Sequence, residues 1–191
     1  MNILRDFVEN VIGKQPEDFY ADFLSCFHLV KMNSGEFITL PGRVENRVGF
    51  LVEGITRTYF CDSQGKEFTK YFNQPGSFIG AYTSMITGEP SQLYIQTMSP
   101  VQFYQASYIQ LNRLADEHPV TDRLFRRLAE FLLVKKEQRE IQLAQLQASE
   151  RYEIFKNQFP GLEQQISQYH IASYLGISAT QLSRIRARRS A

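Results

Sequence analysis

Glycine is distributed unevenly along this chain of 191 residues. Eight of the eleven glycines fall between Gly35 and Gly88, where they separate short runs rich in aromatic and β-branched residues. Such runs are typical of β-strands, and closely spaced strands joined by turns favour a barrel or jelly roll over a parallel sheet. We expect strands at about 27–32, 48–52, 55–61, 67–72, 93–97 and 101–106, with a hairpin loop at 62–66.

Helical patterns flank this β region on both sides. Helices are predicted at about 2–11 and 16–25, where Phe19, Phe23 and Phe27 form one apolar stripe that would cap the barrel. A long helix follows His118 and runs to about residue 147, roughly 40 Å at 1.5 Å per residue. We expect its apolar residues to pack against a partner helix and its own barrel, with a monomeric helix as the alternative: Leu124, Phe125, Leu128, Phe131, Leu132, Val134, Ile141, Leu143, Ala144 and Leu146.

Positive charge is concentrated at the C-terminal end. The formal net charge is +1, yet residues 166–191 contain four arginines and no acidic residue. This placement suits an anionic partner, although a solvated basic tail is the alternative interpretation. A short helix at about 150–157 ends near Pro160 and Gly161 and precedes the basic segment.

Residues 168–189 have the spacing of two crossed helices. Gly176 can adopt the left-handed conformation of the turn between them, and Ala172 allows the helices to approach closely. Ser178 and Gln181 have the spacing of a capping box at the start of the second helix. The expected shared interior is apolar and consists of Ile171, Leu175, Ile177, Leu182 and Ile185.

The outer face of the second helix is polar and basic. A rotation of about 100° per residue exposes Thr180, Ser183, Arg184, Ala187 and Arg188 when the apolar residues point inward. Arginine can bind guanine through two hydrogen bonds, and hydroxyl groups contact bases or phosphates. The pattern predicts a helix-turn-helix; a hairpin of helices without DNA binding is the alternative. We assign Thr180, Ser183 and Arg184 to bases, and Ser167, Tyr169, Arg186, Arg188 and Arg189 to phosphates.

With these parts in this order, the chain resembles the Crp/Fnr family of bacterial regulators over nearly its whole length. The β-region segments that carry the resemblance are NSGEFITLPG at 33–42, GFLVEGITRTYF at 49–60 and NQPGSFIGAY at 73–82. The resemblance implies an α+β fold in three parts. These are a jelly-roll-like, cyclic-nucleotide-binding double-stranded β-helix at 1–117, a long connector or dimerisation helix at 118–147, and an all-α helix-turn-helix domain at 148–191. Because the sequence stops at Ala191, we expect no C-terminal wing.

The resemblance also implies partners. They are a second copy of the chain, RNA polymerase, and double-stranded DNA with a roughly palindromic site whose halves lie about 34 Å apart. Arg184 occupies the family's most reliable base-reading position, whereas Ala179 and Thr180 stand where larger polar readers are usual, so an unfamiliar operator is expected. Without a secretory signal or an apolar run of membrane-spanning length, we expect a cytoplasmic protein.

The sensor region departs from the family pattern. Family members that bind cyclic nucleotides place a glutamate after FxG for the ribose and an arginine about ten residues later for the cyclic phosphate. Here Ala81 follows FIG, Ser91 or Gln92 takes the arginine's place, and no lysine or arginine occurs between Lys70 and Arg113. We expect another effector or none, unless Arg43, Arg47 or Arg57 supplies the charge. The candidate effector pocket comprises Phe78, Gly80, Ala81, Tyr82, Ser91 and Gln92.

Few residues could support metal or redox chemistry. Cys26 and Cys61 are the only cysteines, too few to hold an iron–sulfur cluster, and we expect buried, reduced thiols. A haem or thiol sensor at Cys26 and His28 is possible, but both are expected to pack in the barrel. Three histidines and the absence of known catalytic motifs argue against a cupin-like oxygenase or another enzyme. No cofactor or metal is predicted; a ligand-sensing or scaffold dimer with a degenerate helix-turn-helix is the alternative function.

Overall fold

The computed structural model describes residues 2–188, so the predicted phosphate contact at Arg189 lies outside the described residues. The chain forms two compact units. The first contains the residues up to Thr58 together with Phe72–Phe131, and the second contains Tyr59–Tyr71 together with the residues from Leu132 onward. The second unit thus combines a β-hairpin with the C-terminal helices.

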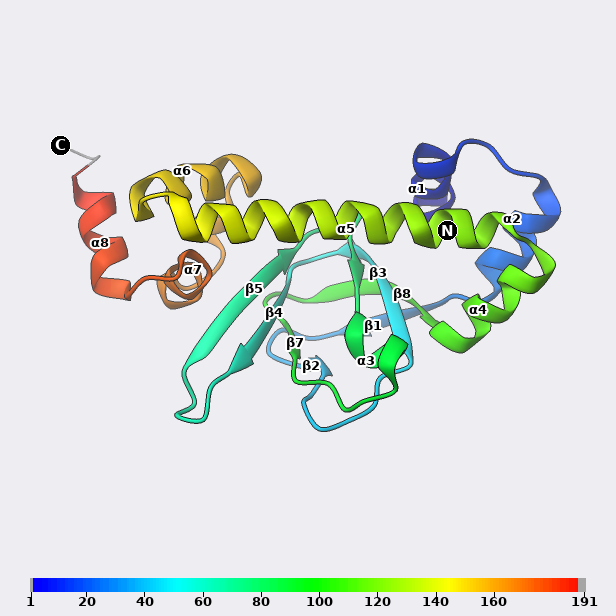
Figure 1. The fold of residues 1–191 in the computed structure, drawn as a ribbon, viewed down its shortest axis with the longest axis horizontal. Coiled ribbons are helices and arrows are strands. Elements are labelled where there is room, and N and C mark those ends of the chain that lie inside the picture. Colours follow the sequence, from blue (N-terminus) through cyan, green and yellow to red (C-terminus); the bar gives the residue numbers. More distant parts are fainter. Residues whose placement is uncertain (1, 189–191) are drawn as a thin grey trace. The chain divides into compact units, whose positions relative to one another are not determined.

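Eight strands form two four-stranded sheets, with the orders β1-β8-β3-β6 and β2-β7-β4-β5 (Figure 1). Neighbouring strands in the first sheet are antiparallel; β3, for example, pairs with β8 from Arg47 opposite Ser107 to Glu53 opposite Gln102. This arrangement confirms the predicted jelly-roll-like fold. The strands are β1 (His28–Met32), β2 (Phe37–Thr39), β3 (Arg47–Glu53), β4 (Thr56–Cys61), β5 (Glu67–Asn73), β6 (Phe78–Ile79), β7 (Tyr94–Thr97) and β8 (Val101–Ser107).

Helices cover one side of the first unit's core. They are α1 (Asn2–Ile12), α2 (Glu17–Ser25), α4 (Tyr108–Glu117) and the beginning of α5 (Val120–Gln145), which all contribute to one buried cluster. The short helix α3 (Tyr82–Thr87) follows β6 and contributes no residue to that cluster. The predicted aromatic stripe Phe19, Phe23 and Phe27 is buried, and it packs with apolar residues of α1 and β3. Aromatic packing of this kind buries a large apolar area in a small domain. The sequence analysis did not anticipate α4 or the short strands β2 and β6.

Three side chains differ from their predicted burial. His28 is exposed on β1, so the expectation that it packs in the barrel is wrong. Cys26 and Cys61 are free thiols, as expected, but both are half-buried rather than buried. Burial raises the pKa of the Cys26 thiol, and the nearby Asp22 adds to this effect. The thiolate that would react as a nucleophile is therefore disfavoured at Cys26.

The long helix α5 has 26 residues, which corresponds to about 39 Å. Leu124 in its first half is buried, and Phe125 and Leu128 are half-buried against the core. The apolar side chains of residues 131–134, Ile141 and Leu143 are exposed. After α5 come α6 (Ala148–Gln158), a 3-10 turn (Leu162–Gln164), α7 (Gln168–Leu175) and α8 (Ala179–Ala187). No helix among residues 2–188 is long and apolar enough to cross a membrane.

Candidate nucleic-acid interface

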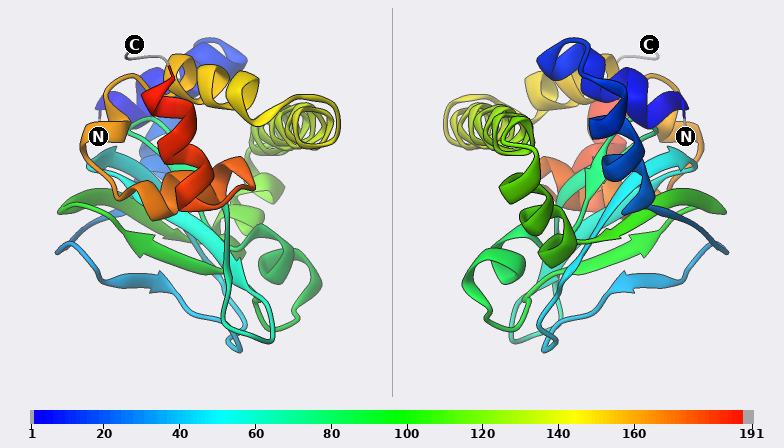
Figure 2. Two further views of the ribbon diagram at one scale, coloured as in Figure 1. Left: turned by 90° about the vertical axis from the view of Figure 1, so that its left-hand side faces the viewer. Right: turned by 90° about the vertical axis from the view of Figure 1, so that its right-hand side faces the viewer.

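Helices α7 and α8 cross each other at the end of the second unit (Figure 2, left). The predicted interior is confirmed at Ile171, Leu175 and Leu182, each with an exposed fraction of 0%. Ala172 is also buried, as expected for a residue at a close helix approach. Ile177 and Ile185 are half-buried and line the margin of this interior. A second layer is aromatic, because Phe155 and Phe159 pack against the ring of Tyr174.

Local capping fixes both helices of this pair. The Ser167 hydroxyl accepts a hydrogen bond from the amide of His170 at the start of α7, and Ser178 accepts one from Gln181 at the start of α8. The serine half of the predicted capping box is therefore present. Gly176 has φ +69°, the left-handed conformation predicted for the turn. These features give α8 a defined start and direction.

The outer face of α8 is exposed where the sequence predicted it: Thr180, Ser183, Arg184, Ala187 and Arg188. Arg186 is half-buried. Ser167 and Tyr169 lie at the start of α7, and both are exposed. Helices α7 and α8 contain no acidic residue, so no carboxylate of this helix pair offsets the positive charge of α8; the Glu67 carboxylate of β5 lies 3.8 Å from His170 on α7. The division into base and phosphate contacts stays a prediction.

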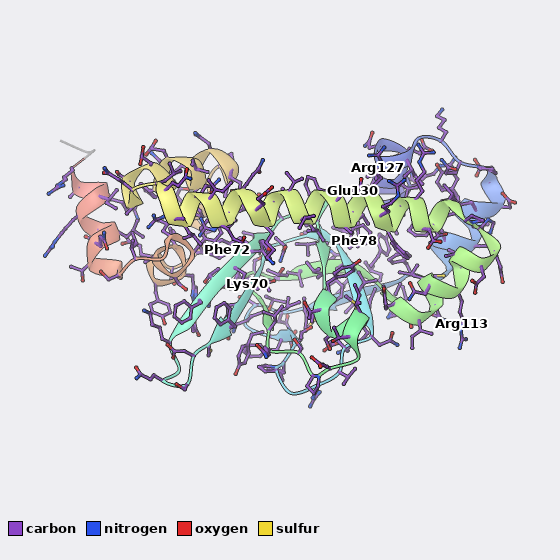
Figure 3. All side chains as sticks on the ribbon, viewed as in Figure 1. Lys70, Phe72, Phe78, Arg113, Arg127 and Glu130 are labelled. Atoms are coloured by element: carbon purple, nitrogen blue, oxygen red, sulfur yellow. The ribbon has the colours of Figure 1, made fainter. Side chains whose placement is uncertain are left out.

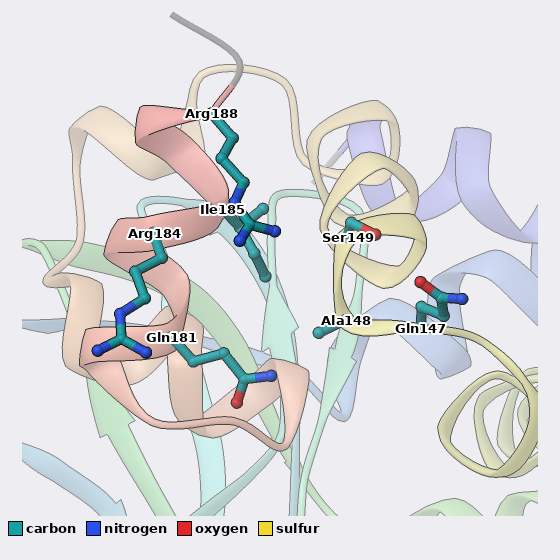
Figure 4. A pocket seen from close by; sticks show the side chains of 7 residues that line it. All are labelled: Gln147, Ala148, Ser149, Gln181, Arg184, Ile185 and Arg188. Carbon is teal, nitrogen blue, oxygen red and sulfur yellow. The ribbon is translucent and has the colours of Figure 1, made fainter.

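A groove separates α8 from the start of α6 (Figure 4). It has a volume of about 680 Å³, and the residues of α8 that line it include Arg184 and Arg188. The sequence analysis did not identify the opposite side, formed by Gln147, Ala148 and Ser149. The QxxE pattern at 147–150 was the available signal, because Gln147 and Glu150 form the reciprocal cap that starts α6. The first backbone amides of a helix favour anions, as do the two arginines.

Two arginines hold the C-terminal end of α7. Arg139 of α5 lies 4.0 Å above the ring of Tyr174 and donates a hydrogen bond to the carbonyl oxygen of the same residue. Arg151 of α6 donates to the Leu175 carbonyl oxygen at 3.0 Å. These cations satisfy carbonyl groups that a helix end leaves without a partner. Burial lowers the pKa of Arg139, although an arginine keeps its charge in proteins.

Residues 29–118 match the cyclic nucleotide-binding domain family. Solved structures are similar over most of the chain. The regulator CLP of Xanthomonas campestris has a TM-score of 0.73 and 15% identity, and 92% of each chain is covered. FixK2 of Bradyrhizobium japonicum has a TM-score of 0.73 and 19% identity, with coverage of 85% of this chain and 83% of FixK2. The chain has a Crp/Fnr-like fold.

The Catabolite Activator Protein of Thermus thermophilus has the same fold. Its TM-score is 0.59 at 19% identity, and the similarity covers 96% of this chain and 86% of that protein. No curated protein matches the chain. At these identities the similarity of solved structures establishes the Crp/Fnr-like architecture, while the chemistry of each site must come from this chain's own residues.

In the Crp/Fnr-like β-roll, the residues of the candidate effector pocket are divided between core and surface. Phe78 packs edge-on against Phe7 and Phe50, with ring centroids 5.3 and 5.1 Å apart. Ala81 and Ser91 are buried, and the Ser91 hydroxyl accepts a hydrogen bond from the Leu93 amide. The remaining three are more open: Gly80 is half-buried, and Tyr82 and Gln92 are exposed.

A buried carboxylate lies next to this cassette, which we define as residues 78–92. Glu45 has an exposed fraction of 4%, and its amide donates to the hydroxyl of Ser84 on α3. Its carboxylate forms an ion pair with Arg47 at 3.1 Å, so the charge of Arg47 is already compensated. Arg43 is exposed and Arg57 is fully buried. Figure 3 marks Lys70 and Arg113, the ends of the sequence interval without lysine or arginine.

One group of metal-ligand side chains lies close together among residues 2–188. Asp22, Glu117 and His118 each place a ligand atom within 4.8 Å of the others. The His118 Nε2 atom lies 2.8 Å from an Asp22 carboxylate oxygen, and the histidine ring packs edge-on against Phe19. The observed contacts join α2 to the end of α4, and they account for the position of His118 through packing and ion pairing.

Proposed function

We propose that this chain is a DNA-binding transcription regulator that acts as a homodimer on a palindromic site without responding to cyclic AMP. The observation that carries the proposal is the exposed, basic face of α8, held on two capped and crossed helices. Such a helix fits the major groove of B-DNA, where base edges differ in their donors and acceptors. DNA as the partner would place the protein in the cytoplasm.

Arg184 is the proposed specificity residue. It lies on the exposed face of α8 together with Thr180 and Ser183, and its fork of donors matches guanine O6 and N7. Arg188 lines the groove beside the start of α6 and suits a phosphate. Ser167 and Tyr169, at the start of α7, and the half-buried Arg186 are further proposed phosphate contacts.

The second half of α5 supports a homodimer. Leu132, Leu133 and Val134 are 43%, 66% and 50% exposed, and Ile141 and Leu143 continue the apolar surface. Exposed apolar residues concentrated on one helix indicate a protein contact. A second α5 would bury them and bring two reading helices to one DNA molecule, as a palindrome requires. Contact with RNA polymerase is part of the proposal for an activator.

The cassette supports the absence of a cyclic AMP response. A buried cyclic phosphate needs a compensating cation, whereas this cassette has a buried Ser91 and lies against Glu45. One structural neighbour, the regulator CLP, is described as responsive to cyclic di-GMP. We propose an effector other than cyclic AMP, or none.

The test begins with selection of duplexes from random DNA by the full chain. The selected site is expected to be a palindrome with half-sites about one helical turn apart. Arg184→Ala should weaken the selected site by about 1–3 kcal/mol and relax one base position. Arg188→Ala should weaken all duplexes similarly and reduce the slope of log K against log salt by about 0.9. Arg127→Ala, at an exposed arginine on α5 that pairs with Glu130, is the matched control (Figure 3).

Two results would contradict the proposal. If no duplex binds with a salt-dependent affinity, the scaffold function with a degenerate helix-turn-helix is correct instead. If Arg184→Ala and Arg188→Ala both bind like the Arg127→Ala control, another surface contacts the DNA. Sedimentation with Leu133→Glu checks the dimer, because this substitution places a charge in the proposed α5 interface.

A further inference from the structure

The hairpin of β4 and β5 contacts the first helix of the reading unit, defined as residues 167–188, through one serine. The Ser173 hydroxyl on α7 donates a hydrogen bond to the Glu67 carbonyl oxygen at 2.8 Å. The Ser173 Oγ atom in turn accepts from the Thr69 amide at 2.9 Å and from the Thr69 hydroxyl at 3.1 Å. One side chain thus makes three hydrogen bonds to two alternate residues of β5.

These bonds fall on the free edge of a sheet. The order β2-β7-β4-β5 places β5 at one end of the sheet, so among residues 2–188 only β4 neighbours it as a strand. Residues 67 and 69 point their backbone groups to the same side, since the strand period is two. Ser173 therefore takes the place of a strand partner for one carbonyl and one amide. Edge groups of this kind are usually covered or otherwise protected in folded proteins.

A second contact on the same face of α7 supports this arrangement. His170 lies one helical turn before Ser173, and its Nδ1 atom is 3.8 Å from a Glu67 carboxylate oxygen. Thr69 is 7% exposed, so its hydrogen bonds with Ser173 are largely shielded from water. A shielded hydrogen bond that loses one partner costs more than an exposed one. The contact is a specific, partly buried polar attachment.

The C-terminal end of α7, directly after Ser173, is also held by Arg139 and Arg151, which donate to the carbonyl groups of Tyr174 and Leu175. Helix α7 is therefore held by the hairpin along one face and by α5 and α6 at its C-terminus. Since α8 follows α7 after a single capped turn at Gly176, the position of α7 sets the position of α8. This connection gives the hairpin a route to the DNA-reading face.

We propose that Ser173 and Thr69 are positioning residues for DNA recognition, through which the β4–β5 hairpin holds α7 and α8 in the DNA-binding arrangement. This inference rests on the proposed DNA-binding function. The hairpin strands continue at Thr58 and Phe72 into the first unit, so the chain itself links this attachment to the β-roll. A conformational change in the β-roll can then alter the position of α8 through the hairpin, and this route does not require a ligand with a phosphate group.

Substitution provides the first part of the test. Ser173→Ala should weaken binding of the selected duplex about five- to tenfold, which corresponds to the loss of one or two buried hydrogen bonds. Thr69→Val removes one of the three bonds and should have a smaller effect. Ser63→Ala, in the exposed hairpin loop, is the control. Circular dichroism confirms folding, and amide hydrogen exchange at Thr69 should be faster in Ser173→Ala because the amide loses its acceptor.

A disulfide provides the second part. Thr69→Cys and Ser173→Cys are combined in a chain that also carries Cys26→Ser and Cys61→Ser. The native hydroxyl oxygens lie 3.1 Å apart, so the two thiols can approach bonding distance. The oxidised protein should bind the selected duplex at least as tightly as Ser173→Ala does, and no more weakly than its own reduced form. Loss of binding on oxidation, restored by a reductant, would overturn the proposal because the hairpin would then block DNA.

The outcomes separate the two proposals. If the wild-type chain binds DNA but Ser173→Ala binds equally well, the positioning role is wrong and the DNA-binding function stands. If Ser173→Ala changes only the free energy of unfolding, the attachment is merely structural and the inference fails. If the wild-type chain binds no duplex, both proposals fail together.

Discussion

The reading unit (residues 167–188) and the cassette (residues 78–92) are built from similar local structures, but the charges around them have opposite signs. Each has a short helix that ends at a left-handed glycine, Gly176 after α7 and Gly88 after α3. Each also contains a serine whose hydroxyl accepts a hydrogen bond from a backbone amide: Ser178 in the reading unit and Ser84 in the cassette. The reading unit exposes Arg184 and Arg188 on a helix that contains no acidic residue, whereas the cassette lies against the buried carboxylate of Glu45.

This difference shows that a region can keep the backbone geometry of the fold without keeping the charged side chains that bind an anionic ligand. The turns and caps that define a Crp/Fnr-like fold are present in both regions. An anion, however, needs compensating charge or donors where it binds. The reading unit supplies exposed guanidinium groups, while Arg47 beside the cassette is already paired with Glu45. Measuring the affinity of each region for an anionic ligand therefore tests the comparison.

The largest expected contrast is between DNA and cyclic nucleotides. The selected duplex should bind with a dissociation constant below about 1 μM at physiological salt, whereas cyclic AMP and cyclic GMP should remain unbound at about 1 mM. The difference follows from the exposed arginines Arg184 and Arg188 of α8, whereas the sequence of the cassette contains no lysine or arginine. Fluorescence anisotropy measures the duplex, and calorimetry measures the nucleotides. Saturable micromolar binding of either nucleotide would show that the cassette recruits a cation from elsewhere.

The next contrast concerns the two serines. Ser84 is 3% exposed and bridges two backbone groups, accepting from the Glu45 amide and donating to the Glu89 carbonyl oxygen. Ser84→Ala should lower the free energy of unfolding by about 1–3 kcal/mol, because both groups lose a buried partner. Ser178→Ala should cost about 1 kcal/mol, as usual for an exposed helix cap.

Denaturant unfolding of the two variants tests this order. Ser178→Ala should in addition weaken DNA binding, since α8 would lose its defined start. Ser84→Ala should leave DNA binding unchanged at temperatures where the variant is folded. Equal losses of stability would mean that water replaces the Ser84 hydroxyl in the variant. The burial of Ser84 would then add nothing to the free energy of unfolding.

Much of the fold could be predicted from local sequence patterns. The turns around the glycines indicated most of the strands, and the apolar spacing indicated the crossed helices α7 and α8. The pattern could not reveal β6 or β2, because strands of two or three residues are too short to show alternation. It also missed α4, because only Leu111 and Leu114 form the buried apolar side of this helix and two residues give a short periodic signal.

The candidate interface could be predicted in part for a similar reason. Its outer face follows from helical geometry once Leu182 is placed inside, so Arg184 and Arg188 were accessible to sequence reasoning. The groove side at Gln147–Ser149 and the attachment of Ser173 to Glu67 join residues far apart in the chain. Contacts between distant segments depend on tertiary packing, which a single sequence does not encode in its local period.

The smallest expected contrast concerns the two glycines. Gly176 has φ +69° and Gly88 has φ +72°, so alanine at either position adopts a strained backbone and should cost about 1 kcal/mol. A Cβ atom at Gly176 would lie 3.4 Å from Leu143 Cδ2, whereas one at Gly88 would meet nothing within 4 Å. Thermal unfolding of Gly176→Ala and Gly88→Ala should therefore show nearly equal losses, with any excess at Gly176 arising from Leu143.

DNA affinity then separates the two sites. Gly176→Ala changes the turn that sets α8 and should weaken the selected duplex, while Gly88→Ala should bind DNA like the wild-type chain. Adding Leu143→Ala to Gly176→Ala removes the atom that the new Cβ would contact. In thermal unfolding, this double variant should regain only the excess loss of stability at Gly176, since the backbone strain remains. If Gly88→Ala weakened DNA binding as much as Gly176→Ala, the cassette would control the reading unit in spite of its missing phosphate ligands.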